Sequence, residues 1–194
     1  MGRMNNDYFL NEEFKNIDFV KSSLQKGEYE NCSFHGCNFS NSDLSNTQFI
    51  DCIFNQCDLS LIKVSGTAIR DTRFKKCKML GIHFENCNKL LFSVDFEGCQ
   101  LDLSCFYQLT LKSTNFSNCS IREVDFTETN LSGSTFDNCD LLDTTFENSV
   151  LENADFRTAS NYRIDPEINQ IKHARFSIPG IIGLLGKYDI KIDT

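Results

Sequence analysis

Cys32, His35 and Cys37 are the residues whose types and spacing come nearest to a chemical site. Cysteine thiolates and histidine imidazoles are common ligands of zinc. The five-residue repeat set out below, however, turns both cysteines toward the core and His35 toward solvent. We therefore expect no metal there and no cofactor. His83 and His173 are isolated in the sequence and suggest no other site.

Signatures of the common enzyme classes are absent from the sequence. It has no phosphate-binding loop, no nucleophile elbow and no Rossmann fingerprint. Carboxylates on a convex surface also lack the pocket that general acid–base catalysis needs. We therefore predict no catalytic residues and expect that the protein is not an enzyme.

The chain is acidic, and its charge is unevenly spread. It has 27 Asp and Glu against 19 Lys and Arg, which gives a net charge of −8. Residues 1–88 carry 10 basic and 11 acidic side chains, residues 89–164 carry 5 and 12, and residues 165–194 carry 4 and 4. Such a chain repels the phosphates of nucleic acid, so direct binding to nucleic acid is not expected. It attracts basic surfaces instead, including those that normally hold DNA.

A large apolar residue recurs at every fifth position from Phe14 to Phe156, apart from a two-residue slip at 86–90. A period of five fits neither a helix, with a period of 3.6, nor a half-buried strand, with a period of 2. The position two before each centre is small, and the position directly before it is often Asn or Asp, which can support a turn. The central residues on this grid are Phe14, Phe19, Leu24, Tyr29, Phe34, Phe39, Leu44, Phe49, Phe54, Leu59, Val64, Ile69, Phe74, Met79 and Phe84, then Leu91, Phe96, Leu101, Phe106, Leu111, Phe116, Ile121, Phe126, Leu131, Phe136, Leu141, Phe146, Leu151 and Phe156.

This pattern, as in Ser42-Asp43-Leu44 and Ala154-Asp155-Phe156, resembles the pentapeptide-repeat family. The resemblance implies an all-β fold, a right-handed quadrilateral parallel β-helix with four pentapeptides in each coil. At β-ladder spacing the repeats would form about seven coils and a rod about 35 Å long. We expect an N-terminal cap at 1–13, the β-helix at 14–176 with a small bulge at 86–90, and a C-terminal module at 177–194.

The four-sided coil assigns an environment to several residue types. Phe and aliphatic centres alternate after Leu91, so Phe should occupy two opposite faces. Parallel side chains in a ladder do not offer disulfide geometry. The cysteines that recur one coil apart should therefore form a buried ladder of free thiols: Cys37, Cys57, Cys77, Cys99, Cys119 and Cys139.

The same register separates acids with a turn role from acids that face solvent. Asp95, Asp125, Asp140 and Asp155 precede a centre and are interpreted mainly as turn residues. Acids that follow a centre should be exposed, either as a solvated face or as a partner-binding surface; among them, Asp102, Glu123 and Asp143 are expected on one face in successive coils. The candidate partner-binding residues are Glu97, Asp102, Glu123, Glu128, Asp137, Asp143, Glu147 and Glu152.

The C-terminal module differs in character from the repeats. Ser177 and Pro179 favour the start of a helix, and residues 189–193 are interpreted as a short strand. Three glycines weaken that helix by about 1 kcal/mol each relative to Ala, so it needs support from the rod. The module is either a lid over the last coil or a dimer interface that also caps it. The candidate interface residues are Ile181, Ile182, Leu184, Leu185, Tyr188 and Ile190.

The ending, from Ile164-Asp165-Pro166 through Leu184-Leu185 to Ile190-Lys191-Ile192, is similar to the tail of one subgroup of that family. This subgroup comprises the Qnr-type quinolone-resistance proteins, the mycobacterial fluoroquinolone-resistance protein and the microcin B17 immunity protein. The resemblance implies a homodimer whose rod mimics duplex DNA and protects DNA gyrase or topoisomerase IV from quinolones or peptide toxins. The alternative is a non-enzymatic interaction scaffold, or an immunity factor with an unrelated partner.

The acidic half can be compared with DNA by its charge density. It would span about 18 Å at β-ladder spacing, over which B-DNA carries about 10 charges. Its net charge of −7 is a partial imitation.

The sequence also carries expectations about location. The first residues, Met1 to Asp7, are polar and do not resemble a secretory signal. No apolar run approaches the roughly 18 residues of a membrane span. We expect a cytoplasmic protein with reduced thiols and no membrane association.

Overall fold

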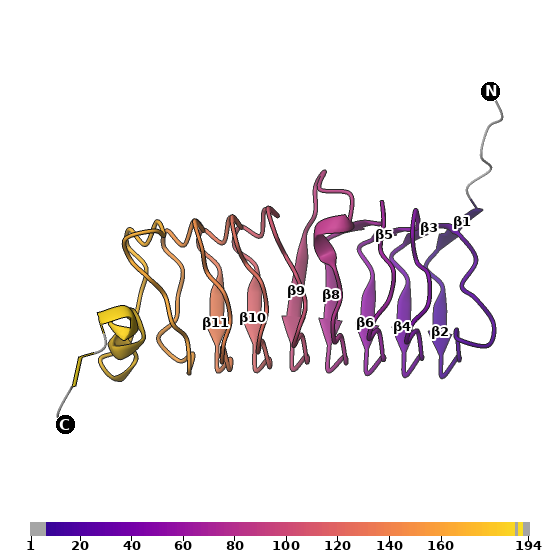
Figure 1. Cartoon of the computed structure of the whole chain (residues 1–194). Helices are drawn as coiled ribbons and strands as arrows, with labels where there is room; N and C mark the ends of the chain where they lie inside the picture. The colour runs from indigo at the N-terminus through magenta and orange to yellow at the C-terminus, as the bar shows by residue number, and fades with distance from the viewer. Residues whose placement is uncertain (1–6, 189, 192–194) are drawn as a thin grey trace.

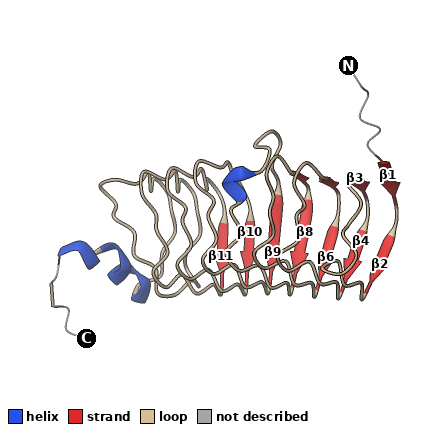
Figure 2. Cartoon of the chain, turned by 45° about the vertical axis from the view of Figure 1, so that its right-hand side comes forward, coloured by secondary structure: helices blue, strands red, loops and turns tan. Residues whose placement is uncertain are grey.

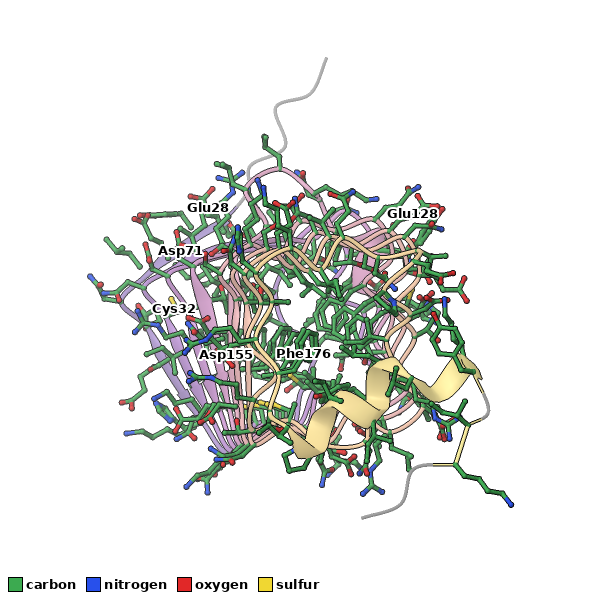
Figure 3. All side chains as sticks on the ribbon, turned by 90° about the vertical axis from the view of Figure 1, so that its left-hand side faces the viewer. Glu28, Cys32, Asp71, Glu128, Asp155 and Phe176 are labelled. Carbon is green, nitrogen blue, oxygen red and sulfur yellow. The ribbon has the colours of Figure 1, made fainter. Side chains whose placement is uncertain are left out.

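The computed structural model describes residues 7–188, 190 and 191. The chain winds as a right-handed parallel β-helix of about seven turns, drawn out into a rod (Figure 1). Seen along its axis, the rod encloses a core filled with side chains, and Phe176 lies near the middle of the C-terminal end (Figure 3). The sequence-based prediction of the fold is thus confirmed.

Two of the four faces form regular parallel sheets. Residue pairing runs straight up each sheet; Phe9 pairs with Tyr29, and Tyr29 with Phe49. The other two faces make only isolated bridges between successive coils, such as Asn38 with Asp58. The first sheet contains β1 (Asp7–Leu10), β3 (Gly27–Glu30), β5 (Gln48–Ile50) and β7 (Ala68–Arg70). The second contains β2 (Glu13–Lys15), β4 (Ser33–His35), β6 (Ile53–Asn55), β8 (Thr72–Lys75), β9 (Val94–Glu97), β10 (Asn115–Ser117) and β11 (Thr135–Asp137).

The predicted N-terminal cap is wrong at its boundary. Residues 1–6 lie outside the described part, but β1 is already a regular strand of the first coil. Phe9 lies five residues before Phe14 and stacks on Tyr29 with 4.5 Å between ring centroids. The five-residue register therefore extends one unit further toward the N-terminus than the sequence-based boundary at Phe14.

The core consists of stacked aromatic rings. One column runs through Phe14, Phe34, Phe54, Phe74, Phe96, Phe116, Phe136, Phe156 and Phe176, with neighbouring centroids 4.6 to 5.5 Å apart. A second column, Phe84, Phe106, Phe126 and Phe146, occupies the opposite face. Rings of the two columns meet edge to face, as Phe116 and Phe126 do at 6.0 Å and 78°. Both ring geometries are favourable for aromatic pairs. Phe thus fills two opposite faces, as the alternation of centres predicted.

The small residues before each centre are small because their polar atoms must reach the backbone of the previous coil. Thr67 Oγ1 donates to Leu44 O at 2.8 Å, and Thr129 Oγ1 donates to Phe106 O at the same distance. Cys57 Sγ lies 3.4 Å from Phe34 O in the equivalent arrangement. The ten cysteines are free, and nine of them are buried. These thiols serve as small core residues with a local hydrogen bond.

Corners of the coil adopt left-handed backbone conformations. Most of the non-glycine residues there are Asn or Asp, for example Asn118 at φ 53° and Asp143 at φ 56°. These residue types tolerate a positive φ better than other L-residues. Leu61, Leu91 and Leu103 occupy such corners too, and their side chains are exposed.

The slip in the repeat is a loop, and it moves one core position. Parallel pairs before it are 20 residues apart, whereas Phe74 pairs with Phe96 across it, two residues further. Leu91, predicted as a centre, lies in this loop at φ 58° with 67% of its surface exposed, and Phe92 is buried in its place. Figure 1 shows the loop rising above the rod between β8 and β9, close to the single-turn 3-10 helix η1 (Phe84–Asn86).

The C-terminal module is built from 3-10 helices, not from the single helix that the sequence suggested. Figure 2 shows η2 (Pro179–Leu184) and η3 (Gly186–Tyr188) at the C-terminal end of the rod. Ser177 Oγ accepts a hydrogen bond from Gly180 N at 3.2 Å, in keeping with its predicted capping role. Of the predicted strand, residues 189, 192 and 193 lie outside the described residues, while Ile190 and Lys191 have no regular structure. No helix among the described residues is long and apolar enough to cross a membrane.

Candidate protein-interaction surface

Acids placed directly before a centre are held by the backbone, as predicted for turn residues. Asp125 Oδ1 accepts from Thr127 N at 2.8 Å, and Asp155 Oδ1 accepts from Arg157 N at 3.1 Å. Arg157 also grips the Asp155 carboxylate with Nε and Nη2, and this contact is the main reason that the pKa of Asp155 is lowered. Such carboxylates stabilise their own coil and are poorly placed to contact a partner.

Four of the eight predicted surface acids already have partners on a neighbouring coil. Glu97 pairs with Lys75 at 3.0 Å, and Asp102 accepts from Ser120 Oγ at 2.6 Å and from Arg122 N at 2.9 Å. The other two contacts are Gln108 Nε2 to Glu128 at 2.6 Å and Thr158 Oγ1 to Asp137 at 2.8 Å. Glu128 nevertheless projects outward from a corner of the rod (Figure 3).

The remaining four acids, Glu123, Asp143, Glu147 and Glu152, have no side-chain hydrogen bond or ion pair with any part of the chain that the structure describes. Glu123 and Asp143 occupy the same left-handed corner one coil apart, at φ 55° and 56°. Their side chains are exposed, as is that of Glu147, while Glu152 is half-buried. These four residues, named here the free acids, are the carboxylates most available to a basic partner.

The predicted alignment of Asp102 with Glu123 and Asp143 is wrong by one residue. Leu103 N donates to Arg122 O, and Glu123 N donates to Leu142 O, both at 2.9 Å. This ladder places Leu103, not Asp102, above Glu123. The reason is arithmetic, because Asp102 and Glu123 are 21 residues apart whereas a coil is 20.

The C-terminal module lies against the last coil through a close backbone contact. A β-carbon added to Gly183 would lie 2.3 Å from Tyr162 O, and one added to Gly180 would lie 2.1 Å from the Tyr162 hydroxyl. Ile164 N also donates to Gly183 O at 3.0 Å. The glycines that weaken a helix are therefore what lets η2 approach the rod.

Ionic contacts fix the far end of the module. Lys187 Nζ lies 2.7 Å from Asp165 and 2.7 Å from Glu167. The Tyr188 hydroxyl donates to Glu167 at 3.0 Å. Between η2 and the coil lies a surface pocket of about 710 Å³, whose lining includes Leu142, Tyr162 and Ile182.

The module leaves an apolar surface at the end of the rod. Ile181, Ile182, Tyr188 and Ile190 from the predicted interface are about half exposed, whereas Leu184 packs against the core and Leu185 is half-buried. Ile178 has 88% of its surface exposed and was missed by the sequence analysis, although it directly follows the capping Ser177. The module thus covers part of the last coil and also presents unpaired apolar side chains, which combines features of the predicted lid and of the predicted interface.

The cysteines and histidine first considered as a metal site lie apart. Cys37 Sγ points inward, 3.6 Å from Phe14 O, while His35 Nε2 lies 3.6 Å from Glu13 on the outer surface. A different group, His83, Glu85 and Cys105, does come together. The sequence analysis missed it because His83 was treated as isolated. The available signal was that His83 and Cys105 both directly precede a buried Phe.

Comparisons with known proteins agree with this architecture. The family model of the pentapeptide repeat region matches residues 27–89 and 89–161. A trypsin-treated form of QnrB1, described as a plasmid-mediated fluoroquinolone resistance protein, superposes with a TM-score of 0.61 at 16% identity, covering 97% of this chain and 100% of that one. Full-length QnrB1 gives 0.55 at 15% identity, with 95% and 100% covered.

A second kind of relative has the same fold. HetL from the cyanobacterium Nostoc sp. strain PCC 7120, described as involved in heterocyst differentiation regulation, gives a TM-score of 0.55 at 14% identity, covering 88% of this chain and 84% of that one. No curated protein sequence matches. The structural likenesses show the fold, and the family model spans well over half of the chain. The chain belongs to the pentapeptide-repeat family.

Proposed function

We propose that the protein is a dimeric DNA mimic that binds DNA gyrase or topoisomerase IV and protects it from quinolones or peptide toxins. The observation that carries the proposal is the position of the free acids next to an exposed apolar end. A tail-to-tail dimer would join two acidic halves into one longer acidic surface with nearly neutral outer ends. The likeness of the fold to QnrB1 supports the same direction.

The free acids are suited to a basic DNA-binding surface because they need no rearrangement to accept a partner. Glu123 and Asp143 recur at the β-ladder spacing of about 4.8 Å. The corresponding positions in B-DNA carry one charge per about 1.7 Å of axis. The rod would thus present a sparser but rigid row of carboxylates to side chains that usually hold phosphates.

The decisive experiment is a gyrase supercoiling assay with ciprofloxacin and added purified protein. We expect rescue of supercoiling at intermediate protein concentrations and inhibition at high concentrations, when the mimic competes with DNA. No rescue and no inhibition at any concentration would refute the proposal. The double variant Glu123→Gln/Asp143→Asn should weaken both effects.

A matched control is available in the nearly neutral half. Asp51 and Asp71 also occupy left-handed corners one coil apart, at φ 52° and 46°. The double variant Asp51→Asn/Asp71→Asn removes the same charge from the same kind of corner and should retain the wild-type effect. Equal loss in both double variants would indicate dependence on total charge and would count against a defined binding surface.

Dimerisation is tested separately by light scattering. The chain has a mass of 22.2 kDa, and we expect twice that value in solution. Ile181→Asp/Ile182→Asp should give monomers, whereas Leu61→Asp, at a leucine of similar exposure far from the module, should not. A wild-type monomer would remove the basis for a joined acidic surface.

The alternative is a non-enzymatic scaffold or immunity factor with another partner. The likeness to HetL supports keeping this alternative, because it is nearly as close as that to QnrB1 while its described role is unrelated. Affinity capture from host lysate would favour it if topoisomerase subunits were absent and one other protein were enriched, with that enrichment lost in Glu123→Gln/Asp143→Asn.

A further inference from the structure

Three side chains with different metal-binding atoms meet on the outside of the rod at its irregular coil. His83, Cys105 and Asp125 form one column, in which His83 bridges to Cys105 and Cys105 bridges to Asp125. Each directly precedes a buried phenylalanine of the second aromatic column, so the core fixes their positions. Glu85 joins them from η1, two residues after His83.

The possible ligand atoms are close enough to share one ion. One atom from each of His83, Glu85 and Cys105 lies within 4.8 Å of the others. His83 Nδ1 is 2.8 Å from Glu85 Oε1, and Cys105 Sγ is 3.7 Å from Asp125 Oδ2. In a tetrahedral zinc site, with ligand bonds of about 2.0 to 2.3 Å, ligand atoms are separated by about 3.5 Å. Small side-chain rotations would therefore bring the three atoms to coordination distance.

The second oxygen of Glu85 is an independent sign of a missing partner. Glu85 Oε2 is buried and has no hydrogen-bond partner among the described residues. A buried carboxylate oxygen without a partner is unfavourable, and native structures seldom retain one without a reason. A cation beside Cys105 would satisfy this oxygen.

The charge at this position also favours a cation. Burial, followed by the nearby Glu85 and Asp125 carboxylates, raises the pKa of the Cys105 thiol to about 12. Two carboxylates and a thiol surround a small space, with no Lys or Arg paired to Glu85 or Asp125 in the described part of the chain. Access is open, since His83 is exposed and Glu85 and Cys105 are half-buried.

We propose that His83, Glu85 and Cys105 form a binding site for a zinc-type divalent cation, with Asp125 or water as the fourth ligand. Nitrogen, sulfur and carboxylate oxygen are the ligand set that zinc accepts in proteins. Binding would replace the proton on Cys105 Sγ with the metal and release that proton to solvent. The ion would join η1 to the following coil, directly before the loop where the repeat slips. This departs from the sequence-based expectation of no metal.

The test uses the reduced full-length protein and zinc chloride in isothermal titration calorimetry, with cobalt chloride as a spectroscopic probe. We expect one ion per chain, a thiolate-to-cobalt charge-transfer band, and release of about one proton measured by comparing buffers of different ionisation enthalpy. Cys105→Ser, His83→Asn and Glu85→Gln should each weaken zinc binding by at least about 10-fold. Cys105→Ser should also abolish the cobalt band.

His35 and Glu13 provide a matched control, because they form a similar His–carboxylate pair without an outward thiol. His35→Asn/Glu13→Gln should bind zinc as the wild type does. Circular dichroism would confirm that each variant is folded. The proposal fails if the folded wild type binds no zinc, or if Cys105→Ser binds it as tightly as the wild type.

Discussion

Gly183 lies against the main chain and ring of Tyr162, so closely that a β-carbon at position 183 would lie 2.3 Å from Tyr162 O and 2.7 Å from the ring. Tyr162 is buried and stacks obliquely on Phe156 and Phe176, the last rings of the first aromatic column. The fit of the C-terminal module thus depends on a position without a side chain.

Gly183→Ala should therefore destabilise the protein by about 1–3 kcal/mol, the usual cost of forcing a methyl group into a packed contact. Chemical denaturation followed by circular dichroism would measure the change. Gly186→Ala is the control, since the nearest atom to an added β-carbon there is 4.0 Å away, on the flexible Arg163 side chain. Equal losses for both variants would show that the contact with Tyr162 is not the cause.

Replacing Leu103 should stabilise the rod. Leu103 occupies a left-handed corner at φ 63° and has 58% of its surface exposed, so it gives up backbone energy without burying its side chain. Leu103→Asn should raise the free energy of unfolding by up to about 1 kcal/mol, because Asn tolerates this conformation. The reverse change at an equivalent corner, Asn118→Leu, should lower it by a similar amount. A stabilising Asn118→Leu would contradict the explanation.

Thiol labelling should separate Cys105 from the other cysteines. Burial raises the pKa of Cys52 and Cys87 to about 12, and the reactive thiolate is correspondingly scarce at neutral pH. In native protein at pH 7.5, maleimide should label Cys105 alone, and slowly, whereas all ten cysteines should react after denaturation. Mass spectrometry of wild type and Cys105→Ser would decide this. Rapid native labelling of several sites would contradict a closed core.

The C-terminal module should loosen in acid. Hydrogen bonds from Lys187 lower the pKa of Asp165 and of Glu167. A carboxyl with a lowered folded-state pKa stabilises fully above its unfolded-state pKa, about 3.9 for Asp and 4.3 for Glu, and loses that contribution as pH falls through the folded-state value. Amide chemical shifts of residues 179–188 should therefore change below about pH 4, while those of β10 stay constant.

The same contact can be removed at neutral pH. Lys187→Gln should increase hydrogen exchange in residues 179–188 at pH 7 because both ion pairs are lost. Lys191→Gln, at an exposed lysine beyond η3, is the matched control. Unchanged exchange in Lys187→Gln would show that apolar packing alone holds the module.

The periodic part of the fold could be predicted because a five-residue period is visible along the chain itself. The exceptions arise where the period is broken. Two extra residues near Leu91 can be placed in several ways, and sequence alone gave no reason to bury Phe92 in place of Leu91. The structure makes that choice through a left-handed corner at Leu91. Likewise, the approach of η2 to Tyr162 involves residues about 20 positions apart, in a region without repeats.

The candidate surface was predictable to a smaller extent. Outward direction followed from the repeat, and it holds for Glu123 and Asp143. Whether an outward acid is free depends on its neighbour one coil away. Glu97 meets Lys75 only because the slip changes the spacing between these coils from 20 to 22 residues. The same change brings Cys105 under His83, which is why neither pairing could be read from a fixed 20-residue register.

The constant 20-residue coil also makes the length of this protein an independent variable. Removing residues 37–56 would join Gly36 to Cys57, which occupies the same position in its coil as the deleted Cys37. The aromatic column would lose one ring and close over the gap, and the module at the far end would keep all of its contacts. Whole coils can therefore be gained or lost as units, so the rod acts as a molecular ruler that changes in steps of about 4.8 Å. The reach of its acidic face could be adjusted by gene rearrangement without redesigning either end.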